Sequence, residues 1–447
     1  LVSHITMIFN KKKTYEQHDN EKGSFYKNTV KPYNSNDILE DYLEVDVCII
    51  GGGLTGVSSA LHLAKKGYKV AICESRLIGW GASGRNGGQL GNGMRKDQFF
   101  LEDKLGINHA KELWKLGLEG VQNALDLINK YKIDCNLQNG VISAGCFSND
   151  LKYFEYEKKH LEKYYNYNDL KLLDKKQIRK EINSDLYESG IINYGSYHIN
   201  PLKFLLGLAT QIRLMNVKVF ENTPITKIVD KDNHIISYSN KKKIKSSKVI
   251  IGCNGYLDKL IKNIRNKFMP INNYVIATEP LGEKKAREII QNNHAVCDTR
   301  FIIDYYRFSE DWRLIFGGGE TYSASFLKNS KNFVRKRMVE VFPSLEKNKI
   351  DYSWGGTLAI TVNRLPHFGT LMNNKLIYAH GYSGHGLSLS ALAGKLITEK
   401  IEGKNDRFDV FSKIKHTTIL GGDLFRRPIY SSAIFYYKMR DTIKYKF

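Results

Sequence analysis

The 447-residue sequence lacks the signatures of several protein classes. Its six cysteines include no CxxC pair and it contains no HExxH motif, so neither a metal site nor covalent catalysis by the protein is predicted. The first residues do not follow the basic, apolar and small-residue order of a secretory signal. The longest uncharged stretch, residues 47–63, is interrupted by glycines and is no transmembrane helix. We therefore expect a cytoplasmic protein with free thiols and no membrane span.

Negative charge is in short supply, because 46 Asp and Glu residues stand against 68 Lys and Arg residues and the formal net charge is +22. Such an excess can indicate a nucleic-acid or membrane partner. Here the basic residues are mostly lysines spread along the whole chain, and they form no patch interleaved with aromatic residues. The densest runs, residues 11–13 and 241–243, fall in an N-terminal arm and a predicted hairpin turn. We therefore predict no nucleic-acid partner.

The order of apolar patterns predicts an α/β (α+β) chain in which a Rossmann-like domain is discontinuous and holds an inserted second domain. Residues 1–40 are polar and irregular and are expected to form an N-terminal arm. Apolar runs typical of buried parallel strands lie at 45–50, 68–74, 247–253 and 375–380. We assign 41–97, 197–264 and 352–404 to the nucleotide-binding domain, 98–196 and 265–351 to a mixed-sheet substrate domain, and 405–447 to a C-terminal extension.

A complete dinucleotide-binding fingerprint follows the first strand. Gly51, Gly53 and Gly56 form the pattern GxGxxG between a predicted strand and a predicted helix, which is the context that the motif needs. The glycines permit a tight turn, a close approach of the backbone to a pyrophosphate, and close packing of the helix on the strand. Glu74 ends the second strand about twenty residues later, where a carboxylate accepts hydrogen bonds from ribose hydroxyls. This context predicts a bound dinucleotide, which the glycines alone would not.

Two further glycine-rich segments extend the predicted ligand. GWGASGRNGGQ, at residues 79–89, combines five glycines with polar side chains, so a long cofactor could run close to its backbone. A flexible surface linker is the alternative, although linkers rarely mix glycine with Trp, Arg, Asn and Gln. HGYSGHG, at residues 380–386, lies between a predicted strand and a predicted helix, where backbone N–H groups can face an anionic ligand. Together these loops favour FAD over NAD.

With these motifs in place, the chain resembles the D-amino-acid-oxidase-like family of FAD-dependent oxidoreductases, and within it most nearly the gamma-glutamylputrescine oxidase group. The resemblance rests on the segment from DVCIIGGGLTG to GRNGGQ and on ATEPL, RLIFGG, RLPHFG, GYSGHG and GGDLFRRP, which occur in the family's order. It runs from residue 24 to the end of the chain. It implies an FAD-binding domain joined to a mixed-sheet substrate domain, with FAD as the cofactor.

The resemblance also implies which residues contact the flavin. In the family, the helix after GYSGHG faces the pyrimidine edge of the flavin, and the loop that corresponds to Arg364 and Pro366 lies beside it. Gln89, Arg364, Tyr382 and His385 are therefore the predicted catalytic residues, in the sense that they position substrate or flavin. The predicted cofactor contacts are Gly51, Gly53, Leu54, Thr55, Gly56, Glu74, Ser75, Ser83, Gly84, Arg85, Asn86, Gly87, Gly88, Gln89, Ile225, Gly381, Gly384, His385, Gly386 and Leu387.

Residues of a predicted hairpin near 305–316 are candidates for substrate contacts. Arg307 and Arg313 could bind a substrate carboxylate bidentately, or they could form ordinary ion pairs on the sheet. Tyr305 and Tyr306, like Tyr382, could line an amine pocket or simply pack. His385 could likewise be a loop histidine that faces solvent.

Two departures from the family narrow these expectations. His198 matches the first histidine of the family's GHLHP segment, but Asn200 replaces the second, so a role that needs both is in doubt. Several sarcosine- and glycine-oxidising relatives carry a cation soon after the second glycine turn, and it holds the substrate carboxylate near the flavin. Here the helix continues with residues 387–389, Leu-Ser-Leu. The substrate is therefore expected to be an amine whose carboxylate, if it has one, is distant.

The predicted function is oxidation of an amine of the gamma-glutamylputrescine type by hydride transfer to flavin N5, followed by hydrolysis of the imine to an aldehyde. Reoxidation by dioxygen would yield hydrogen peroxide. The first alternative is a flavin dehydrogenase of a secondary or methylated amine that passes its electrons to another acceptor. The alternative from another class is a basic, RNA-associated flavoprotein, which would show salt-dependent RNA affinity.

Overall fold

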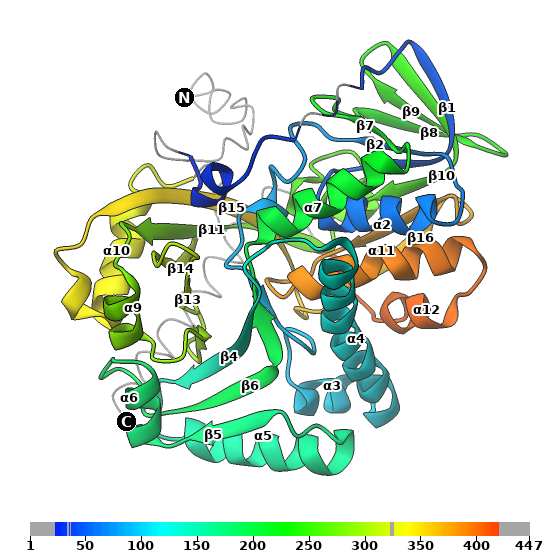
Figure 1. The fold of residues 1–447 in the computed structure, drawn as a ribbon. Coiled ribbons are helices and arrows are strands. Elements are labelled where there is room, and N and C mark those ends of the chain that lie inside the picture. The colour runs from blue at the N-terminus through cyan, green and yellow to red at the C-terminus, as the bar shows by residue number, and fades with distance from the viewer. Residues whose placement is uncertain (1–22, 34, 36, 322–325, 420–447) are drawn as a thin grey trace, which may run out of the picture.

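The computed structural model describes residues 23–33, 35, 37–321 and 326–419, and these fold around two β-sheets that lie side by side (Figure 1). The described part of the first sheet has eight strands and that of the second has nine. The arrangement confirms the predicted class, a Rossmann-like domain joined to a mixed-sheet domain. None of the described helices is both long enough and apolar enough to cross a membrane.

The first sheet is centred on β1 (Tyr42–Ile50), whose last four residues are all buried, as in a strand covered on both faces. It pairs in parallel with β2 (Val70–Cys73) on one side and β10 (Lys242–Ile251) on the other. The direction of the strand order therefore changes beside β1, which is where open α/β sheets bind ligands. The other strands are β7 (Lys218–Phe220) beside β2, β17 (Leu376–His380) beside β10, β16 (His367–Leu371) beside β17, and the hairpin of β8 (Lys227–Asp230) and β9 (Ile235–Ser239) beside β10.

Helices pack against one face of this sheet. α2 (Leu54–Ala64) lies against α7 (Pro201–Leu214) and α11 (Leu387–Ile401), and the apolar side chains of all three share one core with Val47 and Ile49 of β1. Gly394 brings α11 close to α2, because a Cβ at this position would lie 2.4 Å from Ser58. α4 (Ile107–Tyr131) packs on α11 and is flanked by α3 (Gln98–Leu105) and α12 (Asp406–Ser412).

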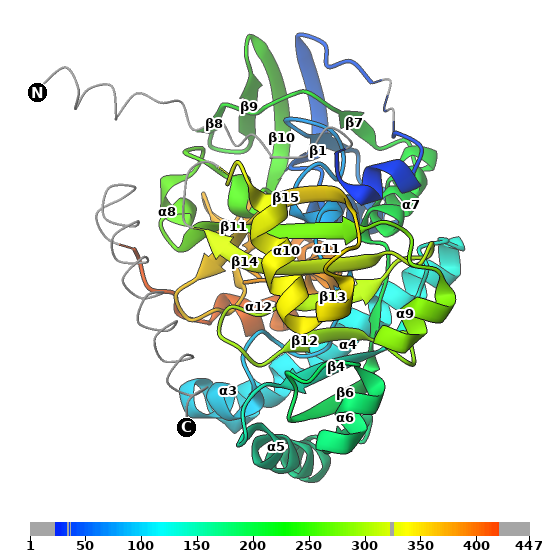
Figure 2. The same cartoon turned by 90° about the vertical axis from the view of Figure 1, so that its left-hand side faces the viewer.

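The second sheet is mixed, because β12 (Ala295–Asp298) pairs in parallel with β4 (Gln138–Gly145) while the other neighbours pair antiparallel. Helix α10 (Ser330–Val341) lies across one face of it (Figure 2). From one edge to the other, the strands are β15 (Ile350–Thr361), β11 (Phe268–Thr278), β14 (Leu314–Thr321), β13 (Tyr305–Phe308), β12, β4, β6 (Ser189–His198) and β3 (Gln89–Leu90), with β5 (Leu170–Leu173) also on β6. The remaining α-helices of the described residues are α5 (Asp150–Tyr165), α6 (Lys175–Glu181), α8 (Lys262–Arg265) and α9 (Glu283–Ile289).

The predicted domain boundaries differ from the structure in three places. β3 was assigned to the nucleotide-binding domain with the rest of 41–97, but it pairs with β6 in the second sheet. β15 was assigned to the nucleotide-binding domain from residue 352, but it pairs along its length with β11 and belongs to the second sheet. α3 and α4 fall in the segment 98–196 that was assigned to the substrate domain, but the apolar face of α4 packs on α11 in the core of the first domain. Sequence periodicity identifies such a face without identifying the surface that it covers.

Both predicted terminal segments include parts that pack on the body of the protein. In the N-terminal arm, the 3-10 helix Phe25–Thr29 buries Phe25 and Tyr26 completely or nearly so, against Trp354 and Tyr352 of β15. In the C-terminal segment, α12 contributes Phe408 and Phe411 to the core of the first domain. The rest of each segment, residues 1–22 and 420–447, lies outside the described residues.

Candidate functional site

The fingerprint glycines form the tight turn that joins β1 to α2. Gly51 has a φ of +111°, and a Cβ there would lie 2.9 Å from the backbone of Gly252 in the segment after β10. A Cβ on Gly56 would lie 2.0 Å from the carbonyl oxygen of Gly51, so no larger residue fits between the helix and the strand. Both glycines therefore have the packing roles that the motif predicts.

Two side chains from the segment after β2 accept hydrogen bonds from N–H groups in the turn that leads into α2. Glu74 accepts hydrogen bonds from the backbone N–H of Gly52 at 2.7 Å and of Arg76 at 2.8 Å. Ser83 Oγ accepts one from the N–H of Leu54, the first residue of the helix, at 2.9 Å. Burial raises the pKa of Glu74, while these hydrogen bonds lower it. A helix start with such donors is suited to a pyrophosphate, and the nearby carboxylate is suited to a ribose.

The segment 79–89 is a folded loop and not a flexible linker. The side chain of Asn86 donates to the carbonyl oxygens of Ala82 and Ser83 and accepts from the N–H of Gly88 at 2.8 Å. The buried Arg85 donates to the carbonyl oxygen of Trp80 at 2.9 Å. Gly84 and Gly88 are both buried in this loop. These bonds hold the polar residues of the loop in one conformation, as cofactor contacts require.

Tyr26 and Trp354 attach this loop to the second sheet, and no sequence motif indicates either role. The hydroxyl of Tyr26 donates to the carbonyl oxygen of Asn86 at 2.8 Å, and the indole N–H of Trp354 donates to that of Arg85 at 3.0 Å. Both side chains are fully buried, and their rings lie 5.5 Å apart in an edge-to-face arrangement. A Trp in a strand and a Tyr in a polar arm look like ordinary packing residues in sequence, so only the fold reveals these contacts.

The second glycine turn, residues 381–386, contacts the first. Tyr382 is buried, and its hydroxyl shares a hydrogen bond of 2.8 Å with Thr55 Oγ1 in the first turn of α2. Gly381 has a φ of +72° and Gly384 one of +89°. A Cβ on Gly384 would meet no atom within 4 Å, so the turn leaves open space at this point. The turn then leads into α11, which begins at Leu387.

His385 connects the second glycine turn to the loop after β3, and Gln89 forms a bond within the second sheet, so neither side chain simply faces solvent. Nε2 of His385 lies 2.9 Å from the carbonyl oxygen of Asn92, and because that oxygen can only accept, Nε2 carries the proton. Burial lowers the pKa of His385 to about 4, so the imidazole is neutral at pH 7. Gln89 begins β3, and its side-chain amide donates to the carbonyl oxygen of Val296 in β12 at 2.8 Å.

Arg364 lies at the same junction, in the loop between β15 and β16. Its φ is +60°, which is unusual for a residue other than glycine. The guanidinium carbon lies 4.6 Å from the centre of the Phe301 ring, a cation–π contact. Phe301 comes from the loop between β12 and β13, so Arg364 connects the first domain to the second sheet.

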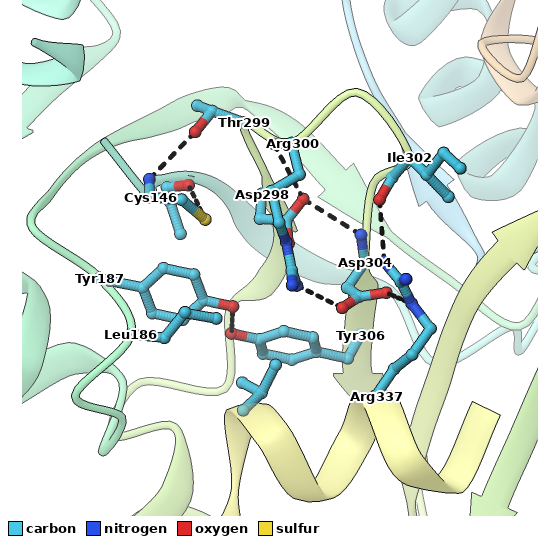
Figure 3. Close-up of polar contacts among 12 residues, drawn as sticks. Cys146, Leu186, Tyr187, Asp298, Thr299, Arg300, Ile302, Asp304, Tyr306 and Arg337 are labelled. Carbon is cyan, nitrogen blue, oxygen red and sulfur yellow. Dashed lines mark hydrogen bonds and ion pairs between the residues drawn. The ribbon is translucent and has the colours of Figure 1, made fainter. Parts of the chain in front are cut away.

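An ion network inside the second domain holds both ends of the loop that carries Phe301 (Figure 3). Arg300 pairs with the fully buried carboxylates of Asp298 and Asp304. Arg337 from α10 donates to Asp304 at 2.5 Å and to the carbonyl oxygen of Ile302 at 2.9 Å. The backbone N–H of Asp304 also donates to Asp298 at 3.1 Å. The two carboxylates and two guanidiniums balance in charge, which makes their burial tolerable.

The residues proposed for substrate contact have partners within the protein. Arg307 is buried and donates to the carbonyl oxygen of Gly87 at 2.8 Å and to that of Phe308 at 3.0 Å. Arg313 pairs with Asp311 at 2.7 Å and Asp351 at 2.6 Å, which is the ion-pair alternative. The hydroxyl of the buried Tyr306 donates to Tyr187 at 2.9 Å, and that of Tyr305 donates to Asn273 at 2.5 Å.

Four further positions that the sequence motifs singled out are buried, cap a helix, or lie at the surface. His198 is fully buried, with Nε2 2.8 Å from the carbonyl oxygen of Asn293, and burial lowers its pKa to about 3. Asn200 caps α7 by accepting from the N–H of Lys203 at 3.2 Å, so it has a structural role where the family has a histidine. Ser75 is exposed and donates to Glu74. Ile225 is half-buried before β8 and packs against the core around β10.

Comparison with known proteins gives this geometry a context. Residues 46–400 match the DAO family, described as FAD dependent oxidoreductase. The chain is 37% identical over 421 residues to the gamma-glutamylputrescine oxidoreductase of Escherichia coli (strain K12), covering 94% of this chain and 98% of that protein. It is 36% identical over 403 residues to the probable oxidoreductase OrdL of Haemophilus influenzae, covering 89% of this chain and 92% of that protein.

Solved structures support the same fold. The crystal structure of glycine oxidase from Geobacillus kaustophilus aligns with a TM-score of 0.71 and covers 84% of this chain and all of that chain. The sequence identity in this alignment is 20%, so the likeness concerns the fold and not the substrate.

Proposed function

Because the chain belongs to the DAO family of FAD-dependent oxidoreductases, we propose that it oxidises a small amine where the two glycine turns meet the second sheet. FAD is its cofactor. The observation that carries the proposal is the contact of the 381–386 turn with both domains: Tyr382 binds Thr55 at the start of α2, and His385 binds Asn92 just after β3.

The described residues fit an FAD molecule. The start of α2 offers N–H donors to a pyrophosphate, and the carboxylate of Glu74, bound to the N–H of Gly52 in the turn before the helix, is placed for a ribose. The folded loop 79–89 leads from that point to the second sheet, and the turn at Gly384 leaves room for a ligand. When bound, FAD supplies the hydride acceptor for amine oxidation.

The protein's own residues then have positioning roles in this proposal. Gln89 joins the end of the 79–89 loop to β12, Arg364 joins the loop between β15 and β16 to Phe301, and Tyr382 and His385 fix the turn before α11. His385 is neutral, with its proton on Nε2. An amine gives up a hydride only as the neutral base. The positive charge of Arg364 at this junction disfavours the protonated form of a bound amine. Arg313 and Tyr306, which are engaged elsewhere, have no part in the proposal.

The proposed substrate class is an amine of the gamma-glutamylputrescine type, oxidised to an imine that water hydrolyses to an aldehyde. Its support is the 37% identity to gamma-glutamylputrescine oxidoreductase over nearly the whole of both chains. It is also supported by the side chains at 387–389, Leu-Ser-Leu, which provide no cation to hold a carboxylate next to the reacting carbon. We further propose dioxygen as the electron acceptor, with hydrogen peroxide as the second product.

The test is a spectroscopic titration of the purified holoenzyme. Under anaerobic conditions, gamma-glutamylputrescine should bleach the visible absorbance of oxidised flavin, whereas glycine and sarcosine should not. Readmission of air should restore the absorbance and produce hydrogen peroxide. Bleaching without oxygen consumption would instead indicate a dehydrogenase that uses another acceptor. If glycine or sarcosine bleached the flavin faster than any polyamine derivative, the proposed substrate class would be wrong.

A further inference from the structure

Three consecutive carbonyl oxygens of the 79–89 loop, those of residues 85–87, each accept a hydrogen bond from a buried side chain of another segment. The donors come from β13, from β15 and from the 3-10 helix of the N-terminal arm, which is drawn in dark blue beside β15 in Figure 1. The bonds run from Trp354 Nε1 to the oxygen of Arg85 at 3.0 Å, from the Tyr26 hydroxyl to that of Asn86 at 2.8 Å, and from Arg307 Nε to that of Gly87 at 2.8 Å.

The N–H groups of the same stretch point the other way. A trans peptide unit is planar, so its N–H group lies opposite its carbonyl group, and the described chain contains no cis peptide bond. The peptide units held by Trp354 and Tyr26 therefore direct the N–H groups of Asn86 and Gly87 away from these donors. Within the described ranges neither N–H has a hydrogen-bond partner, although both residues are half-buried. Because buried backbone donors normally have a partner, these two are available to a ligand.

Tyr26 is itself held by the buried guanidinium of Arg307. Nη2 of Arg307 donates to the Tyr26 hydroxyl at 3.2 Å, and the guanidinium carbon lies 5.8 Å from the centre of the Tyr26 ring. The hydroxyl accepts this bond and donates its own proton to Asn86, so its direction is fixed. In the described chain the guanidinium of Arg307 donates only to neutral oxygens, those of Gly87, Phe308 and Tyr26. Its positive charge is therefore not paired with a carboxylate there.

A continuous chain of hydrogen bonds thus leads from a buried cation to the peptide unit between Asn86 and Gly87. Hydrogen bonds in such a chain polarise one another, so a donor at the Asn86 carbonyl makes the N–H of Gly87 a stronger donor. The side chains of Tyr26 and Trp354 are fully buried, so water does not screen the chain. A backbone N–H that is fixed in this way stabilises negative charge on a bound group without having to reorient.

The loop that carries these N–H groups also contacts the dinucleotide fingerprint. Ser83 Oγ accepts from the N–H of Leu54 at 2.9 Å, and a Cβ on Gly53 would lie 3.0 Å from the same oxygen. The side-chain amide of Asn86 donates to the carbonyl oxygen of Ser83 at 3.1 Å. The N–H groups of Asn86 and Gly87 therefore follow directly after the residues that adjoin the predicted pyrophosphate site, where an extended cofactor would continue.

Because FAD is the cofactor of this family, we propose that Tyr26 is a positioning residue of the FAD site. Its hydroxyl orients the peptide unit between Asn86 and Gly87 so that the N–H of Gly87 binds the flavin, and Arg307 polarises this bond through the Tyr26 hydroxyl. Trp354 orients the preceding peptide unit in the same way. The N-terminal arm is then part of the cofactor site, although it precedes the fingerprint in the sequence. The inference concerns the cofactor alone and does not depend on which amine is oxidised.

Tyr26→Phe tests this role, because it removes the hydroxyl and keeps the ring. The reduction potential of the bound flavin should fall by about 30 mV, which corresponds to a tenfold loss in the preference for reduced flavin, since the negative charge that reduced flavin develops loses stabilisation. The dissociation constant of oxidised FAD from the apoprotein should rise by about 5- to 10-fold. Equilibration with a reference dye measures the potential, and quenching of FAD fluorescence measures the dissociation constant. Trp354→Phe should shift both quantities in the same direction, and it provides the test if Tyr26→Phe does not fold.

Tyr33→Phe is the matched control, because Tyr33 lies in the same arm and its hydroxyl has no hydrogen-bond partner among the described residues. It should leave both the potential and the FAD affinity unchanged. Urea unfolding of each apoprotein separates a packing role from a positioning role. A wild-type potential in Tyr26→Phe, even with lower stability and weaker FAD binding, would make Tyr26 a packing residue and overturn the proposal. An equal shift of the potential in Tyr33→Phe would also overturn it. Neither measurement uses an amine, so the result is independent of the proposed substrate.

Discussion

The hydroxyl of Tyr382 shows how a single residue can join two motifs that are far apart in the sequence. The fingerprint at 51–56 and the turn at 381–386 are each recognisable as glycine turns, and both were predicted. Their contact depends on one hydrogen bond between Tyr382 and Thr55, which are both buried. A Tyr in a glycine turn suggests a substrate contact in sequence, whereas here its hydroxyl has a partner in α2.

A double-mutant cycle tests this link. Tyr382→Phe and Thr55→Val should each lower the free energy of unfolding by about 1 kcal/mol or somewhat more, because each leaves the other hydroxyl buried without its partner. The double variant should cost less than the sum of the two, since neither hydroxyl then remains. Urea unfolding at fixed FAD concentration measures all three variants. Strict additivity would show that the bond does not form.

Some other residues of the site could be predicted from the sequence and some could not. The glycines and Glu74 were predicted because their roles depend on backbone geometry and on spacing along one βαβ unit. Phe301 and Tyr26 could not be predicted, because their roles depend on contacts between segments that are distant in the chain. No local pattern distinguishes these two residues from the many other aromatic residues of this sequence.

At the scale of single elements, α7 illustrates a substitution with a structural explanation. Asn200 occupies the position where the family segment has a histidine, and it caps the helix through the N–H of Lys203. Its side-chain amide also donates to Thr29 Oγ1 at 2.9 Å, which ties the N-terminal arm to the helix. The residue thus serves packing and capping, and its place in a family motif does not by itself make it catalytic.

Asn200→Ala should lower the free energy of unfolding by about 1 kcal/mol, because the N-cap bond is lost. Asn200→Ser should retain most of the stability, since a hydroxyl also caps a helix well. Thermal unfolding of the holoenzyme measures both. If alanine and serine were equally destabilising, the bond to Thr29 and not the cap would account for the role of Asn200.

The loop between β12 and β13 depends on its buried ions. Asp304→Asn should lower the free energy of unfolding by about 3–5 kcal/mol, because Arg300 and Arg337 then lose a charged partner in a buried network. Asp311→Asn is the control, since Asp311 is half-exposed and pairs with Arg313 at the surface, and it should cost at most about 1 kcal/mol. Urea unfolding measures both changes. Similar small losses in the two variants would show that the network contributes little to stability.

The positions of the strands along the chain were predicted better than the sheet to which each strand belongs. The strands at 45–50, 68–74 and 375–380 follow from continuous apolar runs, and each is found. The membership of β15 and the two-residue β3 in the second sheet could not be predicted. Gln89 and Leu90 read as the end of a glycine loop, and only their pairing with His198 and Tyr197 makes them a strand.

For the molecule as a whole, the histidines of the first domain make stability depend on pH. The rings of His367 and His380 are buried 4.8 Å apart, and His416 lies 4.5 Å from His367. Burial lowers the pKa of His367 to about 2, that of His380 to about 3 and that of His416 to about 4. In the unfolded chain the pKa of a histidine is about 6.5. Below that pH the unfolded chain therefore binds protons that the folded protein excludes.

The free energy of unfolding should accordingly fall as the pH drops below about 6.5, by up to about 1.4 kcal/mol per pH unit for each such histidine. Replacing one of them, as in His367→Gln, should make the decline between pH 6.5 and 5 shallower, even if the variant is less stable at pH 8. Urea unfolding at several pH values measures both slopes. Parallel curves for the variant and the wild type would rule out His367 as a contributor.

The central position of β1 has a consequence for how the protein is made. Its neighbour β10 begins at Lys242, and the far strand β17 ends only at His380. At about 5–20 residues per second, a ribosome delivers β10 on the order of ten seconds or more after β1. During that interval an apolar strand has an unpaired edge on the nascent chain, where it can associate with other chains. We therefore expect the sheet to form late in synthesis, and we expect chaperones to cover the edge of β1 until then, whatever the stability of the folded protein.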